Sequence, residues 1–313
     1  MGNCVHGGRS PGASLKFEDF EGLMSNFTEN YTYEEYPYVD DLLPQPCQFT
    51  FCVSFIRSIL ALLVLATILG FLCSVALGVT LAKCPHLWDR RHPGKHKLFL
   101  MSAATTIFAT TLAFFAVEVK QGWVFGYHFC QVTRGLKHGC LFAQGLVVAG
   151  SACPISWDHL RSLLLAMLWI VGFLCATPAA MISTPGDVCA PSLKPELHPW
   201  SLAHTLVFLA IFAILPLVML LAKVALTWHG KNKCLQMDLT WLLYIFWSPY
   251  AIALLLDKLL QENLLTSTCH FQECLDYFLG ISEGFGILHC FALPLLFLGL
   301  GLRRQRTSKA GRP

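Results

Sequence analysis

Long stretches without a charged residue are the feature that most limits how this chain can fold. The last of them runs from Gly284 to Leu302, and a helix needs about 20 apolar residues to cross a membrane. Pro294 is tolerated inside it because neighbouring helices can satisfy the carbonyl group that a proline frees. Only 13% of the residues are charged, against about 25% in soluble domains. The sequence therefore predicts a chain that crosses a bilayer several times.

Seven such segments follow one another. The third is the weakest, because Gly139 to Cys153 is apolar but too short. Its helix must reach back through Lys137 and Arg134 towards Cys130, and charges inside a span normally face the bundle or a wet cavity. The predicted fold class is an all-α membrane protein, a bundle of seven transmembrane helices. The segments are 59–81, 98–117, 130–153, 162–184, 200–222, 239–256 and 284–302.

Basic residues are concentrated on one side of this predicted bundle. The loops after the first, third and fifth segments, with the C-terminal tail, hold fourteen Lys and Arg residues, and the opposite side clearly holds only four. Cytoplasmic loops carry such an excess, so the N-terminus is predicted to be extracellular and the C-terminus cytoplasmic. Three regions result: an extracellular acidic, glycosylated and largely disordered tail over 1–52, the seven-helix bundle over 53–302, and a short basic cytoplasmic tail over 303–313.

The N-terminal tail is strongly acidic. Between Phe17 and Pro46 it has eight Asp and Glu residues and no Lys or Arg. Asn26 and Asn30 each open an N-glycosylation sequence, which favours an extracellular location. One interpretation is a solvated tail. The other is a recognition arm for a basic ligand, because an acidic segment speeds encounter with a cationic partner. The residues of this arm would be Tyr31, Tyr33, Tyr36, Tyr38, Asp40 and Asp41, with the tyrosines open to sulfation.

Of the fourteen cysteines, only those outside the apolar segments are disulfide candidates. Cys130 and Cys189 both fall on the extracellular side, where a bridge is chemically permitted. Cys47 and Cys52 end the acidic tail, and Cys269 and Cys274 precede the last segment. At least one bridge between these two pairs would draw the tail across the mouth of the bundle. Spacing alone does not choose the partners.

Motifs for catalysis are missing from the sequence: it contains no His-Glu-x-x-His, no phosphate-binding glycine loop and no Gly-x-Ser-x-Gly. His86, His92 and His96 cluster in a mostly basic loop, where like charge opposes binding of a cation. We therefore expect no enzyme activity, no cofactor, no metal and no nucleic-acid partner. A transporter or channel is disfavoured as well, because the inner halves of the helices are too apolar and no repeat is visible.

Several short motifs follow one another along the chain in a distinctive order and spacing. Glu283 stands eleven residues before Pro294, with His289-Cys290 just ahead of that proline. The other carriers of the pattern are Phe246-Trp247-Ser248-Pro249, Trp169, Pro178, Pro216, and the pair Cys130 and Cys189.

These residues resemble the chemokine-receptor branch of the rhodopsin-like seven-helix receptors, and the resemblance covers essentially the whole chain. It implies a tail bridge between Cys47 and Cys269 and a second outer bridge between Cys130 and Cys189. A further bridge between Cys52 and Cys274 is our own hypothesis.

The resemblance also implies a ligand site in the mouth of the bundle. Glu283 would meet the cationic N-terminus of a chemokine, assisted by Glu118 and Asp276. The alternative for Glu283 is a carboxylate of the bundle interior, paired with Arg134 or Lys137.

Departures from the family pattern concern the signalling machinery. Signalling members end the third span with Asp-Arg-Tyr, whereas this chain reads Ala149-Gly-Ser-Ala-Cys-Pro. Their last span ends in Asn-Pro-x-x-Tyr, whereas here Leu293 precedes Pro294 and Phe297 takes the tyrosine position. The second segment has no acid at all, and Gly70 is followed by Phe71 where an asparagine is usual. Without these polar groups the usual two-state switch has no visible route.

The sequence thus predicts an atypical receptor that binds, internalises, buffers or transports secreted chemokines without G-protein coupling. We expect it in the plasma membrane, surrounded by lipid and recycling through early endosomes, alone or in oligomers with itself or other chemokine receptors. The alternative is a G-protein-coupled peptide or chemokine receptor with a divergent switch.

Overall fold

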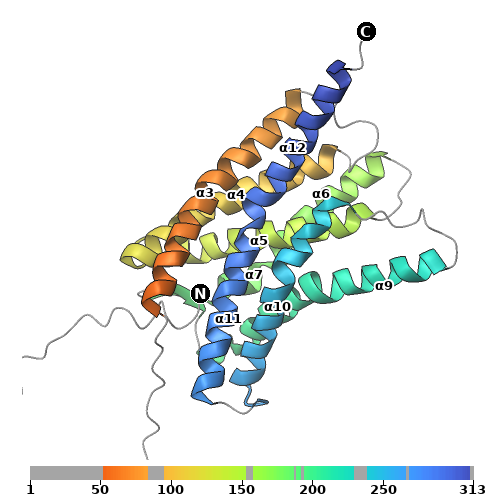
Figure 1. The fold of residues 1–313 in the computed structure, drawn as a ribbon. Coiled ribbons are helices and arrows are strands. Elements are labelled where there is room, and N and C mark those ends of the chain that lie inside the picture. The colour runs from red at the N-terminus through yellow and green to blue at the C-terminus, as the bar shows by residue number, and fades with distance from the viewer. Residues whose placement is uncertain are drawn as a thin grey trace, which may run out of the picture.

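The computed structural model describes residues 52–83, 95–152, 158–186, 188–191, 194–228, 238–265 and 268–310, and this part of the chain is almost entirely helical (Figure 1). A short antiparallel hairpin is its only sheet, with Thr184 opposite Ala190. In order the elements are α3 (Cys52–Lys83), α4 (Lys95–Gln121), α5 (Tyr127–Ala152), α6 (Asp158–Cys175), α7 (Thr177–Met181), β1 (Ser183–Pro185), β2 (Cys189–Pro191), η2 (Pro195–Leu197), α8 (His198–Leu209), η3 (Ala210–Ile214), α9 (Leu215–Trp228), η4 (Leu239–Trp241), α10 (Leu242–Gln261), α11 (Cys269–Ile287) and α12 (His289–Ala310).

Six helical stretches within the described residues are long and apolar enough to cross a membrane. Five of them contain a whole predicted apolar segment, and the sixth, His159–Met181, covers the predicted segment 162–184 except for its last three residues, which lie at β1. Six of the seven expected spans are thus confirmed as helices of the required length and composition. They are Phe55–Lys83, Lys95–Gln121, His159–Met181, Pro195–Trp228, Leu239–Gln261 and Cys269–Arg303.

The remaining long helix is α5, which was predicted as the weakest segment. It packs against α4, α6, α7 and the π-helical turn η3, and most of its residues from Lys137 to Ala152 are buried. At Gly172 of α6 the two helices approach so closely that a Cβ atom would lie 2.4 Å from the backbone of Ala143. A helix enclosed by protein on most sides has no need of an apolar surface towards lipid, which accounts for its low hydropathy.

Aromatic side chains fill the centre of the bundle. Phe108, Phe142, Phe208, Phe212 and Trp247 are all fully buried. The rings of Phe208 and Phe212 have centroids 4.9 Å apart, and Phe208 lies 5.9 Å from Trp247. Phe142 on α5 lies 5.7 Å from Phe208, so α5 packs against α8, and α8 against α10, through rings that bury large apolar areas in preferred tilted arrangements.

One helix leaves the bundle. The π-helical turn η3 is followed by Pro216, and from there α9 runs away from the other helices (Figure 1). No residue of α9 is buried. We refer below to the end of the bundle that carries β1 and β2 as the hairpin end, and to the end that carries Lys97 and Asp238 as the opposite end.

Candidate functional site

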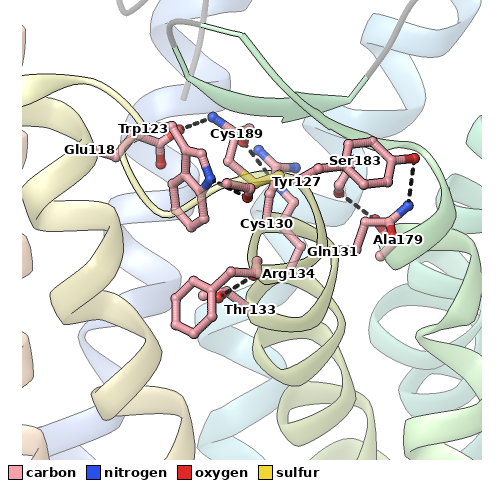
Figure 2. The surroundings of a disulfide bond; sticks show 12 residues. Glu118, Trp123, Tyr127, Cys130, Gln131, Thr133, Arg134, Ala179, Ser183 and Cys189 are labelled. Carbon is pink, nitrogen blue, oxygen red and sulfur yellow. Dashed lines mark hydrogen bonds between the residues drawn. A yellow bond between two sulfur atoms is a disulfide. The ribbon is translucent and has the colours of Figure 1, made fainter.

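The hairpin is fixed to the bundle by a disulfide. Cys130 lies in the first turn of α5 and Cys189 begins β2, and their sulfur atoms are bonded with the Cα atoms 5.6 Å apart (Figure 2). Both cysteines are almost completely buried. This is the bridge that the family resemblance implied. It holds β1 and β2 over the ends of α4 and α5.

Two charged side chains hold the backbone of Cys189 from either side. The Cys189 amide donates a hydrogen bond to Oε1 of Glu118, from the last turns of α4. Nε of Arg134 donates to the Cys189 carbonyl oxygen over 3.0 Å (Figure 2). Glu118 is buried, so its carboxylate, predicted from the sequence as a ligand group, is engaged in holding the hairpin. Hydrogen bonds to charged groups contribute about 1.5–3 kcal/mol each.

A buried ion pair lies beneath the hairpin. Nζ of Lys137 on α5 lies 2.6 Å from Oε1 of Glu283 on α11, and the two residues are only 7% and 4% exposed. The same ammonium lies 4.8 Å from the ring centroid of Phe115. Of the two partners considered for Glu283, the structure shows Lys137, because Arg134 is directed to the hairpin. Glu283 is thus an interior carboxylate that ties α11 to α5.

Two histidines lie next to this pair. The rings of His138 on α5 and His204 on α8 are 4.7 Å apart, edge to face. Nδ1 of His138 lies 3.1 Å from the Arg134 carbonyl oxygen. Nε2 of His204 is buried and has no hydrogen-bond partner among the described residues. No group of three or more His, Cys, Asp or Glu residues in the described part of the chain could hold a metal ion.

The rim of the hairpin end carries further charge. Asp276 on α11 is half-buried and close enough to Asp257 on α10 for their charges to interact. Nζ of Lys258 donates to Oγ of Ser201 over 3.2 Å and lies 3.8 Å from Oε1 of Glu262. Of the three acids predicted from the sequence, Asp276 is therefore the most accessible, since Glu118 and Glu283 are both buried.

The predicted tail site lies outside the described residues. This holds for the six tail residues of the recognition arm, for the glycosylation positions Asn26 and Asn30, and for Cys47. Cys269 is disulfide-bonded to a residue outside the described part. Cys274 carries a free, exposed thiol, so the hypothesised bridge between Cys52 and Cys274 is not formed. The Cys274 sulfur lies 3.7 Å from Nδ1 of His270 in the first turns of α11.

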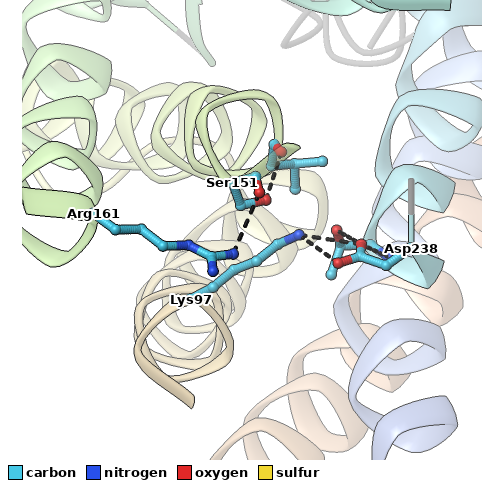
Figure 3. A network of polar contacts seen from close by, with 6 residues as sticks. Lys97, Ser151, Arg161 and Asp238 are labelled. Atoms are coloured by element: carbon cyan, nitrogen blue, oxygen red, sulfur yellow. Dashed lines mark hydrogen bonds and ion pairs between the residues drawn. The ribbon is translucent and has the colours of Figure 1, made fainter. Parts of the chain in front are cut away.

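Sequence reasoning missed a polar network at the opposite end. Nζ of Lys97, which is 1% exposed, donates to both carboxylate oxygens of Asp238 over 3.1 and 2.9 Å (Figure 3). Asp238 also accepts from the amide of Thr240 and so caps the helix that enters α10. Arg161 donates to the Ser151 carbonyl oxygen over 3.4 Å. The two residues of the ion pair are 141 positions apart, and no local pattern marks them as partners.

Helices able to cross a membrane, a covalently pinned hairpin and charged residues buried beneath it define the class: a multi-pass helical membrane protein. No family model matches the chain. Atypical chemokine receptor 1 of Bos taurus is 27% identical over 100% of this chain and 95% of its own length. The proteins of that name from Gorilla gorilla gorilla and Homo sapiens are each 30% identical over 95% of this chain and 90% of their own length. The chain belongs to the atypical chemokine receptor 1 family.

Proposed function

We propose that this protein is a plasma-membrane receptor that binds secreted chemokines and buffers, internalises or transports them without coupling to G proteins. The proposal that the protein binds chemokines rests on its similarity, over nearly the full chain, to relatives named as chemokine receptors. Internalised receptor would recycle through early endosomes, and contacts with other chemokine receptors would form within the membrane.

The proposed topology has seven spans with the N-terminus outside. α5 has 26 residues and so extends over about 39 Å, more than the roughly 30 Å of a hydrocarbon core. Its enclosure by other helices supports its assignment as the seventh span despite its low hydropathy. The hairpin end is then extracellular, residues 1–52 form the outer tail and 303–313 the cytoplasmic tail. An epitope tag on the N-terminus should be detected on intact cells, and detection only after permeabilisation would contradict this topology.

Capture of a ligand would begin on the acidic tail. Chemokines are small basic proteins, and an acidic segment raises the rate of encounter with such a partner. At the mouth the ligand meets Asp276 first, because Glu283 lies deeper. To reach Glu283, a ligand ammonium would have to replace Lys137 on that carboxylate. Opening a buried pair costs about 3–5 kcal/mol unless the new partner restores the contact, so Glu283 binds only a ligand that inserts its cationic N-terminus fully.

The contacts at the opposite end of the bundle support the proposed lack of signalling. The last turn of α5 reads Gly150-Ser151-Ala152 and offers no charged group, and it accepts a hydrogen bond from Arg161 through the backbone of Ser151. The ion pair between Lys97 and Asp238 joins α4 directly to the start of α10. Among the described residues of this end, the charged side chains are engaged in fixed contacts within the bundle, which supports an end that does not switch between two arrangements.

A binding screen with a chemokine panel on expressing cells, with G-protein nucleotide exchange measured in parallel, tests both halves. Saturable binding without exchange is the expected result. Binding with robust exchange would favour the signalling alternative, and no binding to any chemokine would overturn the proposal. Glu283→Gln should weaken binding measured per receptor at the cell surface, since the variant also leaves Lys137 without its partner and lowers the amount of receptor. Glu196→Gln, which alters an exposed acid at the same end, should leave binding unchanged. Unchanged affinity in Glu283→Gln would remove Glu283 from the site.

A further inference from the structure

Positive charge is concentrated where three helices end at the opposite end of the bundle. Three apolar stretches able to cross a membrane each begin or end there on a basic residue: Phe55–Lys83, Lys95–Gln121 and Cys269–Arg303. They have 27 to 35 residues and extend over about 40–50 Å, more than the roughly 30 Å of a hydrocarbon core. Their terminal residues therefore lie at the level of the lipid headgroups. Lys83, Lys95 and Arg303 are all exposed, so a ligand that meets them at this level is a component of the membrane.

The same three helices pack against one another at this end. α12 contacts both α3 and α4 (Figure 1). One buried apolar cluster joins them, formed by Leu77 and Leu81 on α3, Leu98 on α4 and Phe297 on α12. At 1.5 Å per residue, Lys83 and Lys95 lie within about 5 Å of this cluster along their helix axes, and Arg303 lies about 9 Å beyond it along α12. The three cations thus lie on the headgroup side of one and the same cluster.

The start of α4 has an unusual charge pattern. A helix N-terminus carries partial positive charge and favours acids in the first turn, but the first turn of α4 contains no acid and two bases, Lys95 and Lys97. Lys97 is buried and paired with Asp238. Within the described part of the chain, the side chains of Lys83 and Lys95 have neither an ion pair nor a hydrogen bond. Described protein groups therefore leave the positive potential here uncompensated, which favours a bound anion.

The surrounding segments add much positive and little negative charge. The loops and tail on the predicted cytoplasmic side hold fourteen Lys and Arg residues but only three acids, Asp89, Asp158 and Asp238. α12 continues as a helix to Ala310, and four of its last eight residues are basic. Clusters of basic residues directly next to a membrane-crossing helix are typical of proteins that bind anionic lipids of the cytoplasmic leaflet. The ligand class that this charge selects is an anionic lipid headgroup.

A phosphoinositide fits this arrangement better than phosphatidylserine. Its phosphorylated inositol ring carries several negative charges on one rigid headgroup and can therefore contact cations from three helices at once. Phosphatidylserine carries a single net charge, so three separate molecules would have to be immobilised for the same contacts, each at its own entropic cost. Lys and Arg both bind phosphate through charge-assisted hydrogen bonds.

We propose that the ends of α3, α4 and α12 bind the headgroup of one phosphoinositide, with its phosphates at Lys83, Lys95 and Arg303. The site rests on the proposed topology, in which this end faces the cytoplasmic leaflet, where anionic inositol lipids lie. It does not depend on chemokine binding. A headgroup bound in this way ties the end of α12 to the ends of α3 and α4.

Native mass spectrometry of the full-length receptor in detergent micelles tests the site. Titration with phosphatidylinositol bisphosphate is expected to show saturable binding of one lipid. Lys83→Gln with Lys95→Gln should weaken the affinity about thirtyfold, because two basic contacts to the headgroup are lost. Lys223→Gln with Lys231→Gln is the matched control, since it removes the same charge from the same predicted side, beginning on α9, which leaves the bundle. Because Lys83 and Lys95 are exposed, the lipid-free melting temperature should be unchanged.

The remaining arms identify the ligand. Equal weakening by the two double variants would overturn the proposal, because it would show diffuse attraction to the whole basic side. Phosphatidylserine should bind about tenfold more weakly than the bisphosphate lipid, and equal affinity would overturn the choice of headgroup. Soluble inositol trisphosphate should compete poorly, and competition at the same concentration as the lipid would show a site for a free phosphate compound instead.

The lipid titration and the topology test fail independently. Detergent leaves both ends of the receptor accessible, so absence of lipid binding speaks against the site whichever way the chain crosses the membrane. The epitope tag on the N-terminus decides the orientation separately, and a cytoplasmic N-terminus would remove this end from the leaflet that holds the lipid.

Discussion

The two ends of the bundle are held together by different kinds of contact. At the hairpin end, the disulfide of Cys130 and the side chains of Glu118 and Arg134 fix the hairpin, and the pair of Lys137 with Glu283 joins α5 to α11. At the opposite end, the ion pair between Lys97 and Asp238 joins α4 to α10, while α9 has no buried residue.

Under the proposed function, this difference would separate recognition from response. A covalently pinned mouth with a buried charge pair keeps a fixed shape, which would suit the capture of a folded protein ligand. The opposite end combines a direct tie between α4 and α10 with a helix that is not packed into the bundle. In receptors that signal, a change at one end must bias two arrangements of the other. Here the contacts that link the two ends are mainly the apolar and aromatic packing around α5.

The largest expected effect concerns the buried pair at the hairpin end. Lys137→Met leaves the Glu283 carboxylate in the interior without its cation, and breaking a buried pair in this way costs about 3–5 kcal/mol. The melting temperature of the purified receptor in nanodiscs should fall accordingly. The double variant Lys137→Met with Glu283→Gln should regain much of the loss, because no uncompensated charge remains. Equal stability of Lys137→Met and the wild type would show that the pair does not hold the hairpin end.

The next effect concerns the disulfide. Cys130→Ser should destabilise the protein by about 2–5 kcal/mol, the usual consequence of removing a native bridge, and should reduce the amount of receptor at the cell surface. Cys274→Ser is the control, because that thiol is free and exposed. If Cys274→Ser caused a comparable loss, Cys274 would be engaged in a bond that this structure lacks.

A smaller effect is expected at the opposite end. Lys97→Met removes the cationic partner of Asp238 and frees the start of α10; because Asp238 is 24% exposed, the whole contact contributes about 1.5–3 kcal/mol. Hydrogen exchange of the first turns of α10 should become faster. Lys95→Met provides the control two residues away, since Lys95 is exposed whereas Lys97 is buried. Similar exchange rates in both variants would show that Lys97 does not restrain α10, and the comparison between the ends would lose its basis.

Much of the fold was predictable because the bilayer imposes one strong rule. The segments such as 162–184 and 200–222 are visible in the sequence since a helix facing lipid must be apolar along its length. The limits of α5 were harder to predict because its surroundings are other helices and not lipid. Hydropathy could not show the π-helical turn at 210–214 or the outward path of α9, which depend on how Pro216 and its neighbours pack.

Side-chain partners were less predictable than helices. The sequence placed Lys137 and Glu283 inside the bundle, and it left open whether the carboxylate pairs with Lys137 or Arg134. Geometry decides, because Arg134 lies one turn nearer the hairpin and reaches the carbonyl oxygen of Cys189. The pair of Lys97 with Asp238 is not predictable from the sequence, since Lys97 directly precedes the second apolar segment at the end of a basic loop. The structure shows that the Lys97 side chain points into the bundle, where it is 1% exposed.

The smallest effect is expected in α9, and it sharpens the comparison most. Leu217 and Leu221 are 56% and 60% exposed, so they face lipid, which is as apolar as leucine itself. Leu217→Ala and Leu221→Ala should therefore change the free energy of unfolding by no more than about 0.5 kcal/mol. Phe208→Ala, in the fully buried ring cluster, should cost about 3–5 kcal/mol. Thermal unfolding in nanodiscs measures all three.

A loss above about 1 kcal/mol in the α9 variants would mean that α9 packs against protein in the membrane, either on α10 or on a second receptor. The opposite end would then be held more firmly than its described contacts indicate.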